Sequence, residues 1–282
     1  DGMSGRYSLL MAVAPWEPAW IVAAALASLA AQSLGPEVVV ISCDGSPSDS
    51  LRQVFLESGL PVVVLEGPSQ EGTGPTLQRG LKACPTDLVV RADADDLNLP
   101  LRCERLVAAM DGRPELAALG SWIREFFQGG PDAALEPWGE RRPPSGHAAL
   151  QRFSRWRNPL NHPATILRRN RVLAAGGYRA MDSFEDYDLW LRLMAKGGRV
   201  DNLPETLVLA RVDPRRRRRR RGRAYLTAEL TFVTVCLRER LMQPWVAMVW
   251  LLVRCPTRLL PADQLGWLMQ RWLRKPSLTG GP

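Results

Sequence analysis

The sequence predicts an α/β fold in which a mostly parallel sheet carries helices on both of its faces. Short apolar runs typical of buried strands occur at residues 8–13, 37–42, 61–65 and 88–90. Segments with helical patterning alternate with these runs, and the connections between them are short. Strands that alternate with helices in this way form parallel sheets covered on both sides. No Gly-x-Gly-x-x-Gly motif follows the first run, so a dinucleotide-binding fold has little support.

The other elements follow from the same patterns. Glu17-Pro18 is a typical helix start, so the apolar stretch after it is expected to be a helix rather than a signal-peptide core. The stretch 128–144 is rich in Gly and Pro and is expected to be irregular. A helix that opens at residues 184–188 should turn inward Leu189, Trp190, Leu193 and Met194. Further helices are expected at 18–32, after 46, at 76–83, 100–110 and 170–175, and further strands at 116–122, 164–167 and 205–212.

The net charge of +8 comes from one segment of the chain. Residues 215–221 are seven consecutive arginines and Arg223 is an eighth; without them, basic and acidic residues are equal in number. We therefore expect a boundary near Pro214, with one domain over residues 1–213 and a basic helical extension over residues 214–282. The extension should hold three helices whose tryptophans lie among arginines: Trp245, Trp250, Trp267 and Trp272.

The five cysteines are scattered, and no two are spaced like metal ligands. Nothing in their pattern indicates a disulfide framework, so a reducing cytoplasm is the expected compartment. The apolar stretch 244–253 is too short to cross a bilayer, which requires about 20 residues. We therefore expect no transmembrane helix.

The most informative stretch is Arg-Ala-Asp-Ala-Asp-Asp at residues 91–96. Its three carboxylates follow the apolar run 88–90, where a buried strand would emerge into a loop. Ligands of open α/β sheets bind at this end of the strands. Carboxylates packed so closely repel one another unless a cation or a hydrogen-bond donor lies among them. A hard divalent metal that also binds substrate phosphate would suit the cluster, whereas the plain alternative is a solvated acidic turn before the next helix.

Five motifs in order resemble family 2 of the inverting glycosyltransferases, which have the GT-A fold, and more narrowly the bacterial exopolysaccharide enzymes of the amylovoran type. They are Val-Ile-Ser-Cys-Asp-Gly-Ser (40–46), Arg-Ala-Asp-Ala-Asp-Asp-Leu-Asn-Leu-Pro (91–100), Asn-Pro-Leu-Asn-His-Pro (158–163), Ala-Gly-Gly-Tyr (175–178) and Glu-Asp-Tyr-Asp-Leu-Trp-Leu-Arg (185–192). The resemblance covers about residues 8–212. It implies a nucleotide-sugar donor, expected to be a UDP-sugar, a divalent metal (Mn²⁺ or Mg²⁺), and single-displacement transfer to a glycan or lipid-linked acceptor.

The resemblance also assigns roles to donor-side acids. Asp44 matches the position that binds the nucleotide base, although an Asx turn with Gly45 would explain the same residues. Asp93 matches the acid that contacts the donor. Asp95 matches the acid that binds donor and metal, next to the diphosphate. Asp96 is expected to support the loop or to cap the following helix.

On the acceptor side, Asp186 is the candidate catalytic base. It falls at a predicted helix N-terminus, where free N–H groups stabilise an ionised carboxylate, so a capping role is the alternative. A base is needed because inverting transfer removes the acceptor's hydroxyl proton as the nucleoside diphosphate departs. Glu185, His162 and Trp190 are candidates for contacting the acceptor or lining the site.

The chain departs from the family pattern in two informative places. Ala12-Val13-Ala14-Pro15 replaces the common Pro-Val-Tyr-Asn after the first strand, so side-chain contacts expected from Tyr and Asn are absent. The Gln-x-x-Arg-Trp motif of processive enzymes is also absent, because Gln270-Arg271-Trp272 has the wrong spacing. A single transfer per encounter is therefore favoured over polymerisation.

The arginine run has two functional interpretations. It could bind phosphates of the donor or of a lipid-diphosphate acceptor, or it could lie against an anionic leaflet with the tryptophans at headgroup level. A solvated charge run is the plain alternative, and nucleic-acid binding lacks a recognisable module. We rank association with an anionic membrane surface first, which would place the protein at the inner face of the cell membrane. The candidate contacts are Arg215, Arg216, Arg217, Arg218 and Arg223.

The expected function is therefore metal-dependent, inverting, non-processive glycosyl transfer. A nucleotidyltransferase that makes nucleotide sugars is the alternative enzyme, but a glycine-rich phosphate loop is missing from residues 11–15. The non-enzyme alternative is a catalytically degenerate homologue that binds membrane or nucleic acid.

Overall fold

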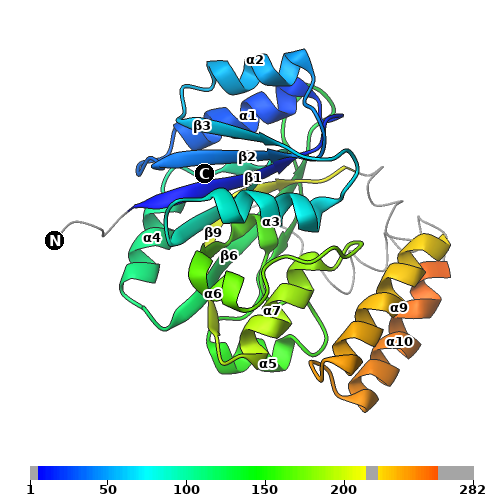
Figure 1. The fold of residues 1–282 in the computed structure, drawn as a ribbon. Coiled ribbons are helices and arrows are strands. Elements are labelled where there is room, and N and C mark those ends of the chain that lie inside the picture. The colour runs from blue at the N-terminus through cyan, green and yellow to red at the C-terminus, as the bar shows by residue number, and fades with distance from the viewer. Residues whose placement is uncertain (1–5, 214–221, 260–282) are drawn as a thin grey trace.

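The computed structural model of the protein describes residues 6–213 and 222–259 (Figure 1). One half of its nine-stranded sheet is parallel, with the strand order β3-β2-β1-β4. These strands are β1 (Tyr7–Val13), β2 (Val38–Cys43), β3 (Val62–Glu66) and β4 (Leu88–Asp93). All four were predicted, because each is a nearly continuous apolar run. Such runs are expected for strands covered on both faces, as β1, β2 and β4 are, whereas Val63 and Val64 of the outer strand β3 are exposed.

The other half of the sheet is mixed. It continues from β4 in the order β8-β6-β9-β5, and only the β6–β9 pair is parallel. β7 pairs with β6 outside this path, in antiparallel direction. The strands are β5 (Leu97–Asn98), β6 (Leu116–Phe127), β7 (Glu136–Arg141), β8 (Ile166–Arg168) and β9 (Arg199–Arg211).

Helices cover both faces of the sheet, which confirms the predicted α/β class. Side chains alternate along β1, so Leu9 and Met11 enter one apolar cluster with α1, α2 and α4, whereas Leu10 enters the other with α3, α6 and α7. The helices are α1 (Ala19–Ala30), α2 (Asp49–Glu57), α3 (Thr73–Ala83), α4 (Arg102–Asp111), α5 (His147–Phe153), α6 (Arg169–Ala174) and α7 (Glu185–Ala195). As predicted, Leu189, Trp190 and Leu193 of α7 are buried.

Two predictions for the middle of the chain were wrong. The stretch 128–144 is not wholly irregular, because it contains β7. Pro137 concealed this strand; a proline is tolerated there because β7 pairs with β6 alone, at an edge of the sheet. The segment 162–164 forms a short 3₁₀ helix, η1 (His162–Ala164), so the strand predicted from residue 164 starts only at Ile166.

Two further helices, α9 (Gly222–Arg238) and α10 (Pro244–Leu259), form a hairpin beside α7 (Figure 1). Phe232 of α9 and Trp250 of α10 share an apolar cluster with Phe184 and Tyr187 at the start of α7. The third helix predicted for the extension, with Trp267 and Trp272, and the predicted boundary near Pro214 lie outside the described residues. Among the described helices, none combines the length and the apolar character required to span a bilayer.

Candidate functional site

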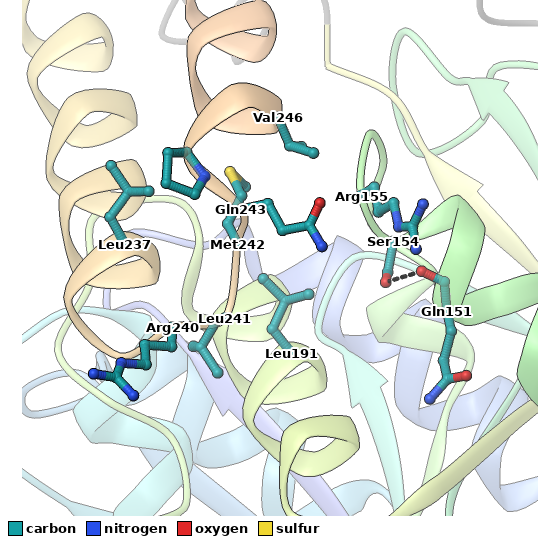
Figure 2. Close-up of a pocket in the computed structure, with 11 residues that line it drawn as sticks. Gln151, Ser154, Arg155, Leu191, Leu237, Arg240, Leu241, Met242, Gln243 and Val246 are labelled. Carbon is teal, nitrogen blue, oxygen red and sulfur yellow. Dashed lines mark hydrogen bonds between the residues drawn. The ribbon is translucent and has the colours of Figure 1, made fainter.

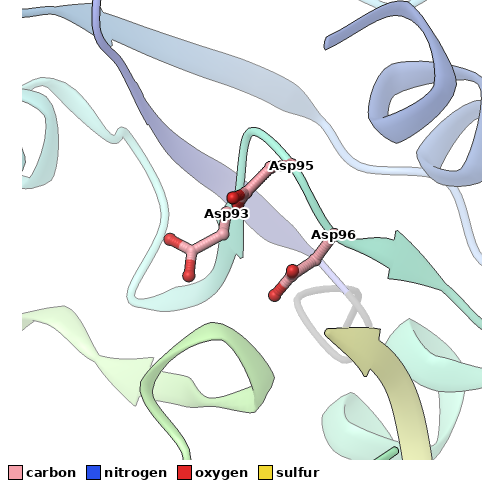
Figure 3. A group of neighbouring side chains, drawn as sticks. All are labelled: Asp93, Asp95 and Asp96. Atoms are coloured by element: carbon pink, nitrogen blue, oxygen red, sulfur yellow. The ribbon is translucent and has the colours of Figure 1, made fainter. Parts of the chain in front are cut away.

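Three carboxylates gather on the turn that follows β4 (Figure 3). Asp93 is the last residue of β4 and stands in register with Ala12 of the neighbouring strand β1. Oxygen atoms of Asp93, Asp95 and Asp96 lie within 4.8 Å of one another. The turn lies at the carboxyl end of β4, which is the edge of the parallel half of the sheet where α/β proteins bind their ligands. The short strand β5 follows the turn.

The turn is braced from the far end of β9 by Arg211. The backbone N–H of Arg211 donates to Asp96 Oδ1 at 2.8 Å, and its Nε donates to the backbone oxygen of Asp95 at 3.0 Å. The guanidinium also lies 4.8 Å from the ring centroid of Phe126. Asp96 is buried, and burial is the main reason why its pKa is raised, followed by the charges of Asp95 and Asp93. Asp96 therefore sits inward, as a residue that supports the loop would.

Arg91 lies beneath the turn and forms an ion pair with Asp93. Its guanidinium is almost wholly buried and also donates to the backbone oxygen of Ala92. A second buried arginine, Arg102 of α4, donates to the backbone oxygens of Arg91 and of Pro163, the latter at 2.7 Å. The acidic turn thus rests on two buried cations, which fix the end of β4 against the segment that contains His162.

The donor set of the turn fits a hard divalent cation. Carboxylate oxygens are the ligands that Mg²⁺ and Mn²⁺ prefer, and Mg²⁺ typically takes one or two from the protein and the others from substrate phosphates and water. Asp93 and Asp95 are partly exposed, whereas Asp96 is buried and its Oδ1 accepts from Arg211. The two residues that fit a metal facing solvent are therefore Asp93 and Asp95.

Asp44 follows β2 at the same edge of the sheet, with β1 between β2 and β4. Its Oδ1 accepts from the backbone N–H of Glu71 at 2.8 Å. Arg79 of α3 binds both the Glu71 carboxylate and the backbone oxygen of Cys43, the latter at 2.6 Å. One carboxylate oxygen of Asp44 thus orders the loop between β3 and α3.

Asp186 and Glu185 form the first turn of α7. Asp186 Oδ2 accepts from Asn158 Nδ2 at 2.5 Å, and Asp186 Oδ1 accepts from the backbone N–H of Tyr187 at 2.7 Å. The N-cap position belongs to Phe184, which provides no side-chain cap. Burial and then the neighbouring charge of Asp186 raise the pKa of Glu185 to about 7. At neutral pH, the pair therefore carries fewer than two full negative charges.

His162 and Tyr178 form a buried pair that is influenced by both acidic groups. His162 Nε2 and the Tyr178 hydroxyl are 3.0 Å apart. Burial, followed by the charge of Arg91, lowers the pKa of His162 to about 4, while the charges of Asp186 and Asp93 act in the opposite direction. The charges of both acidic groups thus act on His162, and the imidazole is neutral at neutral pH.

Trp190 is fully buried behind this pair. Its ring meets the His162 ring edge-on, with 6.2 Å between centroids. It therefore backs the His162 ring from the core and does not line an open surface.

Glycines allow α3 to approach the start of α7. A Cβ on Gly74 would lie 2.0 Å from the backbone oxygen of Arg179 and 3.5 Å from the Glu185 Cβ. Gly177 has a φ of 63°, and a Cβ there would lie 2.0 Å from the Gln78 side chain. Gln78 in turn accepts from the backbone N–H of Tyr178 at 2.8 Å. The Gly-Gly-Tyr motif thus positions Tyr178 beside α3.

The structure adds four residues to those assigned from the sequence: Arg91, Asn158, Tyr178 and Arg211. The first three lie inside motifs that were recognised in the sequence, although these three residues were given no role there. Nothing near Arg211 in the sequence indicates a link to the acidic turn, since it lies 115 residues from Asp96. Of the basic candidates, Arg223 is exposed at the start of α9, and Arg215 to Arg218 lie outside the described residues.

Comparison with known proteins decides the family. Residues 19–177 match the family model described as glycosyl transferase family 2. The chain belongs to glycosyl transferase family 2. The predicted family is thereby confirmed, and the protein is a glycosyltransferase. Family membership supports this activity over that of a nucleotidyltransferase.

Curated relatives match this family 2 enzyme over most of its length. The amylovoran biosynthesis glycosyltransferase AmsE of Erwinia amylovora is 32% identical over 87% of this chain and 91% of its own. The UDP-Gal:alpha-D-GlcNAc-diphosphoundecaprenol beta-1,3-galactosyltransferase of Escherichia coli is 29% identical over 96% of this chain and 97% of its own.

The fold is also found among solved structures. S. aureus TarS 1-349, in complex with UDP-GlcNAc, superposes with a TM-score of 0.57 at 18% sequence identity. The match covers 74% of this family 2 enzyme and 59% of the TarS chain, so this chain spans less than two thirds of that structure. At this level of identity the likeness establishes the shared fold.

Proposed function

We propose that this glycosyltransferase transfers a sugar from a UDP-sugar to a hydroxyl of a glycan or lipid-linked acceptor, with inversion, one sugar per encounter. The observation that supports the proposal is the presence of two acidic groups, the cluster of Asp93 and Asp95 after β4 and the pair of Glu185 and Asp186 at the start of α7, whose charges both act on His162. One group suits a metal-bound diphosphate, and the other suits a hydroxyl that loses its proton.

On the donor side, Asp93 and Asp95 are the proposed ligands of a divalent metal, Mn²⁺ or Mg²⁺. When bound, such an ion neutralises charge on a leaving diphosphate. Arg91 holds the Asp93 carboxylate in place through its ion pair, and Arg211 holds the backbone at Asp95. Asp44 keeps one oxygen for the nucleotide base while the other orders the loop at Glu71.

On the acceptor side, Asp186 is the proposed base. Asn158 and the N–H of Tyr187 donate to its two oxygens, which orients the carboxylate. Glu185, whose pKa is raised to about 7, is partly protonated at neutral pH and suits hydrogen-bonding the acceptor. Neutral His162 suits lining the site, with Trp190 behind it. In this arrangement the acceptor proton passes to an Asp186 oxygen as the donor bond breaks.

The printed names of related proteins support the substrate classes. The E. coli relative is named for UDP-Gal and for an acceptor on diphosphoundecaprenol, and TarS was crystallised with UDP-GlcNAc. An acceptor carried on a lipid diphosphate would be reached at a membrane surface. We therefore propose peripheral association with the anionic inner face of the cell membrane, assisted by the arginines at 215–221 and Arg223.

Hydrolysis of a panel of nucleotide sugars, with Mn²⁺ or Mg²⁺ added, tests the donor side. Asp95→Asn should remove metal-dependent turnover, and full turnover in this variant would refute the metal assignment. Asp186→Asn should retain donor binding and lose transfer. If this variant bound the donor and still transferred sugar at the normal rate, the base would have to be another residue.

A further inference from the structure

The hairpin of α9 and α10 is joined to the proposed acceptor side of the site. Phe184 stacks on Phe232 with 4.8 Å between ring centroids and 16° between ring planes. Tyr187 lies 5.1 Å from the same Phe232 ring. Phe184 and Tyr187 flank Glu185 and Asp186 in the chain, so the Phe232 ring of the hairpin contacts the residues on either side of this acidic pair. A surface that receives the hairpin would therefore lie close to the acceptor side of the site.

The outer face of α10 is apolar although it is exposed. Trp245, Met248 and Leu252 recur at the spacing of one helix face and are 50%, 58% and 67% exposed. The opposite face, with Val246, Ala247 and Trp250, is buried against α9 and α7. A helix that is apolar on both faces requires a partner for each of them. On the outer face Trp245 contacts Trp156, whereas Met248 and Leu252 remain mostly exposed among the described residues.

The neighbouring helix has an ordinary solvated face. The exposed residues of α9 include three threonines and two arginines, with Leu230 and Leu237 between them: Arg223, Thr227, Thr231, Thr234 and Arg238. The two helices belong to one hairpin, but the exposed side of α9 mixes leucines with polar residues, whereas that of α10 is apolar. The apolar outer face is therefore specific to α10, and a contiguous apolar face of this kind marks an interaction site.

The charge of the hairpin complements an anionic surface. Its two acidic residues are both neutralised: Glu229 is buried between Arg254 and Arg258, at 2.9 and 2.7 Å. The other acid, Glu239, pairs with Arg179 at 2.7 Å. Among the described residues, by contrast, no carboxylate forms an ion pair with Arg223, Arg238 or Arg240. The hairpin thus presents unpaired guanidinium groups and no unpaired acid.

A cleft lies between the inner side of the hairpin and the catalytic domain (Figure 2). It has a volume of about 460 Å³ and lies between α5 and the turn that joins α9 to α10. Leu191, Met242 and Val246 form its apolar wall, and Arg155 and Arg240 stand on opposite sides of it. At its edge, Trp156 and Trp245 meet edge-on, with 5.9 Å between their ring centroids. Tryptophan is favoured at the boundary between lipid headgroups and water.

We propose that the outer face of α10, formed by Trp245, Met248 and Leu252, inserts among the headgroups of an anionic bilayer. The arginines of α9 and of the following turn, Arg223, Arg238 and Arg240, bind the lipid phosphates, and the stack of Phe184 on Phe232 holds the start of α7 close to the membrane. Only the link to a lipid-linked acceptor depends on the proposed function. The lipid-binding surface is argued from the residues of the hairpin.

Vesicle flotation of the full chain tests the surface. The protein should float with vesicles of phosphatidylcholine and phosphatidylglycerol, and much less with phosphatidylcholine alone. Replacing the face by Trp245→Gln, Met248→Gln and Leu252→Gln should weaken binding by about tenfold or more, because the apolar contacts are lost while the arginines remain. Glutamine keeps helix propensity. The control carries Leu56→Gln and Leu101→Gln, which alter apolar residues that are 86% and 48% exposed elsewhere, and it should float like the wild type.

Two results would overturn the inference. If residues 260–282 cover the face in solution, the triple variant would float normally and melt at a lower temperature. If a second copy covers it, the wild type would be a dimer in light scattering and the variant a monomer with unchanged flotation. Hydrolysis of the nucleotide sugar without vesicles separates the two proposals. Intact hydrolysis with lost flotation supports the surface, and flotation without hydrolysis of any donor refutes only the proposed function.

Discussion

Asn158 donates a hydrogen bond of 2.5 Å to Asp186 across 28 residues of chain, from the loop before η1 to the first turn of α7. The bond leaves Asp186 with one oxygen toward Asn158 and the other toward the N–H of Tyr187. The orientation of the proposed base is therefore set by two donors from different elements.

Asn158→Ala should lower kcat by about a hundredfold, because a misplaced base loses its alignment with the acceptor hydroxyl. The KM for the donor should hardly change, since Asn158 binds the acceptor-side acid. Initial rates over a range of donor and acceptor concentrations measure this split. Asn170→Ala, which changes an exposed asparagine at α6, is the control and should behave like the wild type. A variant at Asn158 that raised only the donor KM would contradict the assignment.

Arg102→Met should destabilise the protein by about 3 kcal/mol, because a buried charge network would lose its central donor. Arg102 is fully buried and bonds Asn98 Oδ1 and the backbone oxygens of Arg91 and Pro163. Methionine fills similar space and leaves these acceptors unsatisfied. Urea unfolding measures the loss. Arg105→Met, on the exposed side of α4, should change the free energy of unfolding little, and an equal effect from both variants would disprove the role.

His162 should make the protein sensitive to acid. Burial lowers its folded pKa to about 4, whereas an unfolded histidine titrates near about 6.5. Between these values, the unfolded chain binds a proton that the folded chain does not, so this group lowers stability as pH falls through the window. His162→Gln should therefore lose less stability between pH 6.5 and pH 4 than the wild type does. Thermal melts across this range measure the difference. His147→Gln is the comparison, and identical profiles for the two variants would contradict the prediction.

Glu229 should stabilise the hairpin far more than Glu239 does. Glu229 is fully buried and binds Arg258 through both oxygens, at 2.7 and 2.8 Å. Removing its charge by Glu229→Gln would leave the buried Arg258 without its carboxylate partner, at a cost of about 3 kcal/mol. Glu239→Gln breaks a partly exposed pair with Arg179 and should cost less than about 1 kcal/mol. Chemical denaturation of both variants measures the contrast. Similar losses would mean that the Glu229 cluster is not a buried ion pair in solution.

Strands and motifs could be predicted where the chemistry is local. β1 to β4 are apolar runs that are visible in the sequence itself, and three of them, β1, β2 and β4, are buried on both faces. The acidic turn was also predicted, because Asp93, Asp95 and Asp96 are neighbours in the chain. The order of the five motifs then led to the family, which the comparison confirmed.

The remaining features depend on contacts between distant segments. The pairing of Arg211 with Asp96 and the pairing of β5 with β9 leave no periodic signal. Strand β7 carries Pro137, which is typical of loops, and is held by its partner β6. The sequence showed that residues 244–253 are apolar, but it does not tell which side of this helix is covered.

The bracing of the acidic turn by Arg211 bears on how the protein is made. Residues 93–96 leave the ribosome long before Arg211, which is 115 positions later than Asp96 and supplies a hydrogen bond to it. The short strand β5 likewise finds its partner only in β9. An emerging chain therefore exposes three neighbouring carboxylates without that support until the last strand is synthesised. The donor half of the site is completed late, and a chain truncated before β9 should lack it even though both proposed metal ligands, Asp93 and Asp95, are present.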